Sequence, residues 1–405
     1  MGIAKVNNVA GAAVGKVNNV TVGNIAKVNG VEAAAAATTA SRWVIATGGG
    51  YIATASNSDL TSWTTYDGTD SSTPTALSIA YGKNAQGAGI YVCTRDASSR
   101  EIQVSGTDVT TDAVWTDINI SPNDDQRIVM WGAASNGATA GIWMTVGQDG
   151  SIFRSTDGAA SWSAVDLSST NLGSGDLKGI ASNGSGKWMF AQSSKLYIST
   201  DDGASFTETT PWGTNTPSKI QGITYTNNTW VIAYSRSGIK LRLCADSDTT
   251  DWSGEIEINS NFNNFPKRDY NGDGSDESLA FGDPGSTDTK YVKFAAYQGR
   301  VLAVSTGGSG RSFIMFNVNG KTLSNGTWIE PNGAAASIFD GYDGDKPQDV
   351  ATDGSTWVMS MMGGDVFKTT SASAADGWTK VQNDLAIGGT QYHLVAITAD
   401  ILQPI

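Results

Sequence analysis

The chain has 405 residues, of which 39% are hydrophobic and 16% charged, and its formal net charge is −13 at pH 7. A chain this acidic repels phosphate backbones and anionic lipid surfaces, so we expect no nucleic-acid partner and no membrane insertion. No apolar run reaches the about 18 residues of a membrane-spanning helix, and no basic segment with a Leu-rich core marks a signal peptide.

The composition favours strands and turns over helices. Gly, Ser, Thr, Asn and Asp are abundant, whereas Lys, Glu and Leu are sparse. The length suits two domains or one repeat architecture. Cys93 and Cys244 belong to no C-x-x-C pair, so we expect two buried free thiols.

Three near-copies of one short sequence open the chain, with lysines spaced 11 residues apart. They contain Lys5-Val6-Asn7, Lys16-Val17-Asn18 and Lys27-Val28-Asn29. The Asn-Asn and Asn-Gly pairs tolerate the positive φ of tight turns, which predicts short β-branched pieces joined by turns. Pieces this short bury little surface alone, so residues 1–31 need a partner surface. A disordered tail is the alternative, and the β-branched residues argue against a supercoil of 11-residue period.

This arm resembles N-terminal repeat segments of virion proteins in tailed bacteriophages, especially marine and cyanobacterial ones. The resemblance covers the arm alone and implies a structural protein of a virion, assembled in the host cytoplasm. Its implied partners are other virion proteins or further copies of this chain, bound through the arm.

From residue 41 onward one unit recurs seven times. Each unit has a small-residue apolar strand, a polar turn, a strand opening on an aromatic residue, a third strand, and a fourth opening on Trp or Phe. Four short strands at a period of about 40–50 residues are typical of a β-propeller blade. The second strands are expected to begin at Trp43, Tyr91, Trp143, Trp188, Trp230, Val301 and Trp357. The fourth are expected to begin at Trp63, Trp115, Trp162, Phe206, Trp252, Trp328 and Trp378, and we expect the tryptophans to pack between blades.

The two ends of this region predict a closed ring. The first unit lacks its innermost strand, and an extra strand at residues 392–397 follows the last unit. Filling the vacant place with that strand removes exposed sheet edges. The predicted fold is therefore all-β: a seven-bladed β-propeller at 41–405 closed by the C-terminal strand, after an extended N-terminal repeat arm and linker at 1–40.

Two turns carry a Ser-x-Asp pattern followed by an aromatic residue. Asp and Gly supply the backbone freedom and side-chain acceptors of a tight turn. The residues are Ser199, Asp201, Gly203 and Phe206 in one turn, and Ser155, Asp157 and Trp162 in a degenerate copy. They resemble the Asp-box, or BNR, hairpins of sialidase-type β-propellers, which implies a structural role at the blade periphery.

An acidic segment in the longest insertion predicts a calcium site. Carboxylate and amide oxygens at alternate positions wrap a hard cation, and the glycine at position six allows the sharp turn. Ala280 occupies the twelfth position, so this is no complete EF-hand. The segment resembles the shorter calcium loops of dockerins, thrombospondin repeats and integrin-type propellers. That resemblance implies structural Ca2+ held by the side chains of Asp269, Asn271, Asp273 and Glu277 and the carbonyl of Ser275; an acidic solvated turn is the alternative.

No set of residues predicts catalysis. His393 is the single histidine and is expected to pack on the closing strand. A glycosidase needs two carboxylates across a cleft, and the sequence does not select two among 39 acidic residues. We therefore expect a non-enzymatic virion structural protein, a tail, fibre or decoration component that displays its propeller for host or glycan recognition. The alternatives are a free-standing carbohydrate-binding lectin and a glycoside hydrolase of sialidase-like fold.

Overall fold

The computed structural model divides into two compact units, Met1–Thr39 and Ala40–Ile405. In the first unit it describes only the short strands of the arm. In the second it describes residues 41–66, 75–96, 102–106, 109, 115–121, 125–212, 216–217, 219–236, 239–257, 292–305, 313–327, 347–370, 378–382, 385–387, 390–391, 394–400 and 402.

The arm contains three two-stranded antiparallel hairpins. They are β1 (Lys5–Val6) with β2 (Val9–Ala10), β3 (Lys16–Val17) with β4 (Val20–Thr21), and β5 (Lys27–Val28) with β6 (Val31–Glu32). All three have the same register, in which a valine pairs with a valine and the lysine pairs with the last residue of the hairpin. Asn7, Asn18 and Asn29 lie outside the described residues.

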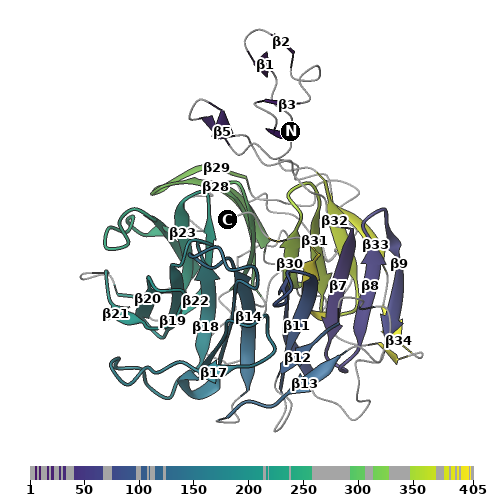
Figure 1. Cartoon of the computed structure of the whole chain (residues 1–405), viewed down its shortest axis with the longest axis horizontal. Coiled ribbons are helices and arrows are strands. Elements are labelled where there is room, and N and C mark those ends of the chain that lie inside the picture. The colour runs from purple at the N-terminus through teal and green to yellow at the C-terminus, as the bar shows by residue number, and fades with distance from the viewer. Residues whose placement is uncertain are drawn as a thin grey trace, which may run out of the picture. The chain divides into compact units, whose positions relative to one another are not determined.

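The second unit is a seven-bladed β-propeller, which confirms the predicted fold. Its described residues form seven four-stranded antiparallel sheets, and consecutive strands are neighbours in each (Figure 1). From the innermost strand outward, sheet 1 is β36 (Leu394–Ala399), β7 (Arg42–Thr47), β8 (Ile52–Ser56) and β9 (Asp59–Tyr66). Sheet 2 is β10 (Thr75–Lys83), β11 (Gly89–Asp96), β12 (Ile102–Val104) and β13 (Thr116–Ile118). Sheet 3 is β14 (Gln126–Gly132), β15 (Ile142–Gly147), β16 (Ile152–Ser155) and β17 (Ser163–Ala164).

The remaining sheets repeat this order. Sheet 4 is β18 (Leu177–Ser182), β19 (Trp188–Gln192), β20 (Lys195–Ser199) and β21 (Thr207–Thr209). Sheet 5 is β22 (Lys219–Thr226), β23 (Thr229–Ser235), β24 (Ile239–Ala245) and β25 (Ile256–Glu257). Sheet 6 is β26 (Val292–Tyr297), β27 (Arg300–Ser305), β28 (Phe313–Asn319) and β29 (Thr322–Thr327). Sheet 7 is β30 (Pro347–Thr352), β31 (Trp357–Met361), β32 (Val366–Thr369) and β33 (Thr379–Gln382).

Two further elements are small. A hairpin of β34 (Ala386–Ile387) and β35 (Thr390–Gln391) follows sheet 7. One 3-10 turn, η4 (Gln148–Gly150), links β15 to β16. No helix within the described residues is long and apolar enough to cross a membrane.

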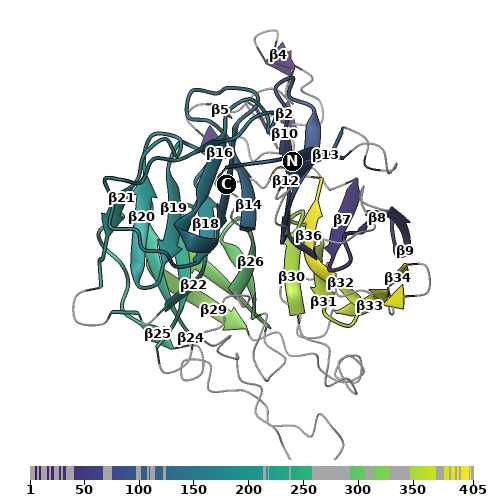
Figure 2. The same cartoon turned by 90° about the horizontal axis from the view of Figure 1, so that it is seen from below.

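The C-terminal strand closes the ring as predicted. β36 pairs with β7 in antiparallel register, with Ile397 opposite Ile45, and so becomes the innermost strand of sheet 1. It covers Leu394–Ala399 among the described residues, and residues 392 and 393 of the predicted strand lie outside them. Figure 2 shows the innermost strands β14, β18, β26, β30 and β36 nearest the middle of the propeller, with β9 and β21 at its edge. First and last segments of the propeller therefore share one sheet.

The core lies between neighbouring sheets, because second strands are apolar on both faces. β19 is buried along its whole length, whereas the outer strand β17 is exposed. Trp143 of sheet 3 packs with Ile90 and Val92 of sheet 2. Trp188 of sheet 4 packs with Met144 of sheet 3. These contacts confirm the prediction that tryptophans fill the spaces between blades.

The expected starts of the outer strands are corrected by the structure. Trp115, Trp162, Phe206 and Trp378 immediately precede β13, β17, β21 and β33 instead of opening them. For Trp162 the reason is that its indole packs under the preceding turn, where its N–H donates to the carbonyl of Ala159 at 3.3 Å. Trp328 lies outside the described residues.

Candidate functional site

The innermost strands of the seven sheets surround a central cavity of about 220 Å3. Its lining comprises Ser78–Tyr81 of β10, Ile128–Trp131 of β14, Lys178–Ser182 of β18, Gly222–Tyr225 of β22, Val292–Ala296 of β26, Asp349–Ala351 of β30, and Ile397–Thr398 of β36. A concave site to which every repeat contributes is the first candidate for ligand binding or catalysis.

One ring of this lining is apolar in all seven sheets. Each residue of the ring is opposite the same position of its second strand, which places the seven at one level of the cavity. They are Ile79, Val129, Ile180, Ile223, Phe294, Val350 and Ile397. This apolar ring gives the cavity a narrow hydrophobic level with no side-chain donors or acceptors.

A register shift precedes the ring in six of the seven innermost strands, with β26 as the regular one. A β-bulge redirects a side chain and increases the local twist. In β18 the shift lies between Leu177 and Ile180, so Lys178 is part of the bulge. In β30 it lies between Pro347 and Asp349. Lys178 and Asp349 therefore lie at or beside bulges, whereas Lys293 lies in the strand without one, β26.

Asp349 is the carboxylate of the described lining, and it is bound into the framework. One of its oxygens accepts a hydrogen bond from the backbone N–H of Val350 at 2.9 Å, and the other accepts from Ile397 of β36 at 3.1 Å. Burial raises the pKa of Asp349, and the nearby ammonium of Lys293 partly offsets that rise. Ser78 makes the matching contact between sheets 2 and 3, where its Oγ accepts from the N–H of Val129 at 3.3 Å. The carboxylate thus joins sheet 7 to the closing strand.

The other charged side chains among the described residues that line the cavity are two lysines. Lys178 is 1% exposed, and Lys293 is half-buried beside Asp349. A raised carboxyl pKa beside a lysine is a pattern found in acid–base sites. Here both oxygens of the carboxylate already accept backbone hydrogen bonds, which fits a structural role better than proton transfer to a substrate.

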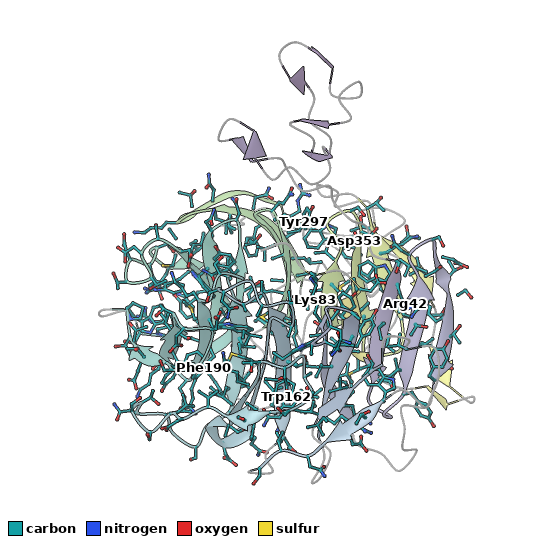
Figure 3. The ribbon with its side chains drawn as sticks, in the orientation of Figure 1. Arg42, Lys83, Trp162, Phe190, Tyr297 and Asp353 are labelled. Atoms are coloured by element: carbon teal, nitrogen blue, oxygen red, sulfur yellow. The ribbon has the colours of Figure 1, made fainter. Side chains whose placement is uncertain are left out.

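The two predicted turns form closely similar hydrogen-bond sets. Asp201 accepts from the N–H of Ser205 at 3.0 Å and from the hydroxyls of Ser205 and Ser199 at 2.6 and 2.7 Å. The N–H of Gly203 donates to Ser199 Oγ at 2.9 Å. Phe206 packs edge-on against Phe190, labelled in Figure 3, with ring centroids 4.7 Å apart. Each contact stabilises the hairpin itself.

The degenerate copy forms the same set with one difference in the backbone. Asp157 accepts from Ser155 Oγ at 2.8 Å and from the N–H of Ser161 at 3.0 Å. Ala159, at the position of Gly203, has φ of 67°. Burial opposes ionisation of Asp157 and Asp201, but the hydrogen bonds from the serines outweigh it and lower the pKa of both carboxyls.

These turns also join neighbouring sheets. Asp202 accepts from the N–H and hydroxyl of Ser135, in the sheet-3 turn between β14 and β15, at 2.9 and 2.6 Å. Asp246 of sheet 5 likewise accepts from Lys187 and Asn183 in the sheet-4 turn, at 2.8 and 3.0 Å. Sequence reasoning did not predict that Asp202 and Asp246 contact a neighbouring sheet. For Asp202 a signal was present: the hairpin needs only Asp201, so the second aspartate of the pair was free for another contact.

The remaining predicted site residues are not tested by this geometry. The calcium segment from Asp269 to Glu277 and His393 lie outside the described residues. Within the described part of the chain, no group of three or more His, Cys, Asp or Glu side chains could hold a metal ion. Cys93 and Cys244 are buried free thiols, as expected, and burial raises the pKa of each to about 12.

Known protein structures resemble this chain at low sequence identity. No protein-family model and no curated protein sequence matches the chain. Among solved structures it is similar to YCF48 from Cyanidioschyzon merolae (13% identity, 76% of this chain and 84% of that one, TM-score 0.44). It is also similar to YCF48 bound to D1 peptide (10%, 87% and 94%, 0.49) and to Raptor of Chaetomium thermophilum (10%, 76% and 24%, 0.46). At these identities the likeness concerns the fold alone.

Proposed function

We propose that this chain is a non-enzymatic structural component of a virion, anchored by its arm, whose propeller is displayed for recognition of a host surface or a glycan. The observation that carries this proposal is the arm: three hairpins of identical register, at a spacing of 11 residues, form a unit separate from the propeller. The resemblance of the propeller turns to sialidase-type Asp-box hairpins belongs to the same proposal.

An anchoring role follows from how little the hairpins bury. Each strand has two residues, and isolated two-stranded hairpins are marginal in water. A surface that pairs with or covers all three at once supplies the missing stabilisation. That surface belongs to further copies of the chain or to other virion proteins.

The geometry of Asp349 favours a non-enzymatic propeller over the hydrolase alternative. The carboxylate that faces the central cavity is held by two backbone N–H groups and ties sheet 7 to the closing strand. The hydrolase alternative requires a second carboxylate of the cavity to act with it. Turnover of aryl-glycosides that disappears on mutation of Asp349 would favour that alternative.

Light scattering after size exclusion tests the anchor on the full chain and on residues 40–405. We expect a defined oligomer for the full chain and a monomer for the shortened one, with the same melting temperature of the propeller. A full-length variant with Val6, Val17 and Val28 changed to Asp should also be monomeric, because charge at these positions opposes burial. If the shortened chain keeps the oligomeric state of the full chain, the arm is not the assembly element. Monomers in both cases, combined with glycan affinity, would support the lectin alternative.

A further inference from the structure

A second, polar cavity of about 200 Å3 lies at the rim of the propeller, between the turn of sheet 3 and that of sheet 4. Arg154 of β16 lines it together with Thr156, Ser163 and Asp166, and Ala204 of the sheet-4 turn closes one side. Trp162, labelled in Figure 3, marks the sheet-3 turn beside it. The whole neighbourhood belongs to the continuous described segment 125–212.

The orientation of Arg154 is fixed by one bond. Its Nε donates to the backbone carbonyl of Asp202 at 2.7 Å, across the boundary between the two sheets. Within the described segment, its terminal N–H groups have no hydrogen-bond partner, and they belong to the half-buried side chain that lines the cavity. A guanidinium presents these groups as a planar fork that matches both oxygens of a carboxylate.

The two carboxylates whose charges act on Arg154 accept hydrogen bonds from other donors. Asp202 accepts from Ser135, and Asp201 accepts from Ser199 and Ser205. Among the ion pairs of the described residues, Arg154 takes part in none. Burial lowers the pKa of Arg154, and the charges of Asp202 and Asp201 offset part of that effect. A partly desolvated cation without an ion-pair partner gains from an anion supplied by a ligand.

The rest of the cavity is hydroxylic. The hydroxyls of Thr156 and Ser163 have no hydrogen-bond partner among the described residues. One oxygen of Asp166 accepts from the N–H of Ser168 at 2.9 Å, and bonds from Ser168 lower the pKa of this carboxyl. Thus one cation, two hydroxyls and one carboxylate face the same space. A matching ligand carries a carboxylate and neighbouring hydroxyl groups.

We propose that this rim cavity binds a uronic-acid unit of an acidic polysaccharide. The sugar carboxylate pairs with the guanidinium of Arg154, and the sugar hydroxyls bond to Thr156, Ser163 and Asp166. The cavity is smaller than the roughly 300–1,000 Å3 of sites for drug-sized ligands, which fits one sugar unit of a longer chain. The inference rests on the proposed function, in which the propeller is the recognition module, and it adds the place and the class of ligand.

Titration calorimetry on the full chain tests the proposal with three probes: a tetrasaccharide of galacturonic acid, the neutral tetrasaccharide of galactose, and inorganic phosphate. We expect binding of the acidic tetrasaccharide alone. Arg154→Gln should weaken it at least about tenfold, because a charge-assisted bidentate pair is lost. Thr156→Val should weaken it about fivefold, the effect of one neutral hydrogen bond. The matched control is Arg236→Gln, which removes the same charge from a side chain paired with Glu255 at 2.8 Å and should leave affinity unchanged.

Three results would overturn the proposal: no binding of the acidic tetrasaccharide, equal binding of the neutral one or of phosphate, or equal weakening by Arg154→Gln and Arg236→Gln. If Arg154→Gln does not fold, the affinities of Arg154→Lys and Thr156→Val for the acidic tetrasaccharide test the proposal instead, because neither change removes a hydrogen bond within the Ser-x-Asp turns. Light scattering on the same samples separates the two proposals. Absence of sugar binding with arm-dependent assembly intact contradicts only the rim site, whereas loss of assembly contradicts only the anchor.

Discussion

The carboxylate of Asp349, in the innermost strand of sheet 7, accepts a hydrogen bond from the backbone N–H of Ile397 in the strand that closes the ring. The inner edge of each innermost strand faces the cavity and has no further strand to pair with. At Ile397 and Val129 a side chain of the preceding sheet supplies the acceptor instead, from Asp349 and Ser78 respectively. A buried carboxyl group therefore ties sheet 7 to the closing strand, in addition to the pairing of that strand with β7.

Asp349→Ala should lower the free energy of unfolding by about 1–3 kcal/mol, because two buried N–H groups lose their acceptor. Urea denaturation followed by tryptophan fluorescence measures this. The pH dependence has a defined sign. Burial raises the pKa of Asp349 in the folded protein, so its contribution favours folding at low pH and is lost as pH rises through that raised pKa. Asp349→Asn should flatten this decline, and an unchanged slope would exclude Asp349 as its source.

Gly158→Ala should destabilise the propeller more than Gly137→Ala. Both glycines have positive φ, 75° and 74°. A Cβ on Gly158 would lie 2.1 Å from the backbone nitrogen of Ala85 in the neighbouring sheet, whereas a Cβ on Gly137 meets nothing within 4 Å. Backbone strain alone costs about 1–2 kcal/mol, and the clash adds to it. Thermal denaturation compares the two variants, and equal melting temperatures would contradict a tight contact between sheets 2 and 3.

Asp201→Asn should cost about 1–2 kcal/mol of folding stability at pH 7, because three hydrogen bonds lose their charged acceptor. The lowered pKa of Asp201 fixes how this changes with pH. Its contribution is present above the unfolded pKa of about 3.9 and is lost as pH falls through the folded value. Wild type and variant should therefore converge in acid. Denaturation midpoints of both proteins at pH 7, 5 and 3 test this. A difference in midpoint that stays constant with pH would show that the lost stability comes from altered side-chain geometry and not from the charge of Asp201.

The segment from Asp269 to Glu277 is predicted to hold a calcium ion. Adding Ca2+ to protein that a chelator has stripped of metal should therefore raise its melting temperature. Asp273→Asn removes a predicted ligand and should abolish the shift. Asp276→Asn removes the same charge from a residue outside the predicted ligand set, so this variant should keep the Ca2+-dependent shift in melting temperature. Differential scanning fluorimetry with and without Ca2+ compares the three proteins, and an equal loss in both variants would indicate general charge screening instead of a coordinated ion.

The sequence by itself determined the architecture of the propeller. Aromatic residues at recurring positions and turn residues between short apolar strands specify four-stranded units, because alternation and turn chemistry are local properties. The vacant first place and the surplus strand specified that the ring closes within the first unit. The Ser-x-Asp turns were equally readable, since Ser199 and Asp201 bond within their own hairpin.

Only the tertiary structure decided which residues of different repeats meet. The partners of Asp349, Asp202 and Asp246 lie one sheet away and 48 to 67 residues distant in the chain. The bulges that place Lys178 and Asp349 at the cavity follow from strand pairing, which no local pattern encodes. Arg154 shows the same limit: its sequence neighbours identify a hairpin, and its partly desolvated position arises only where that hairpin meets the turn of the next sheet.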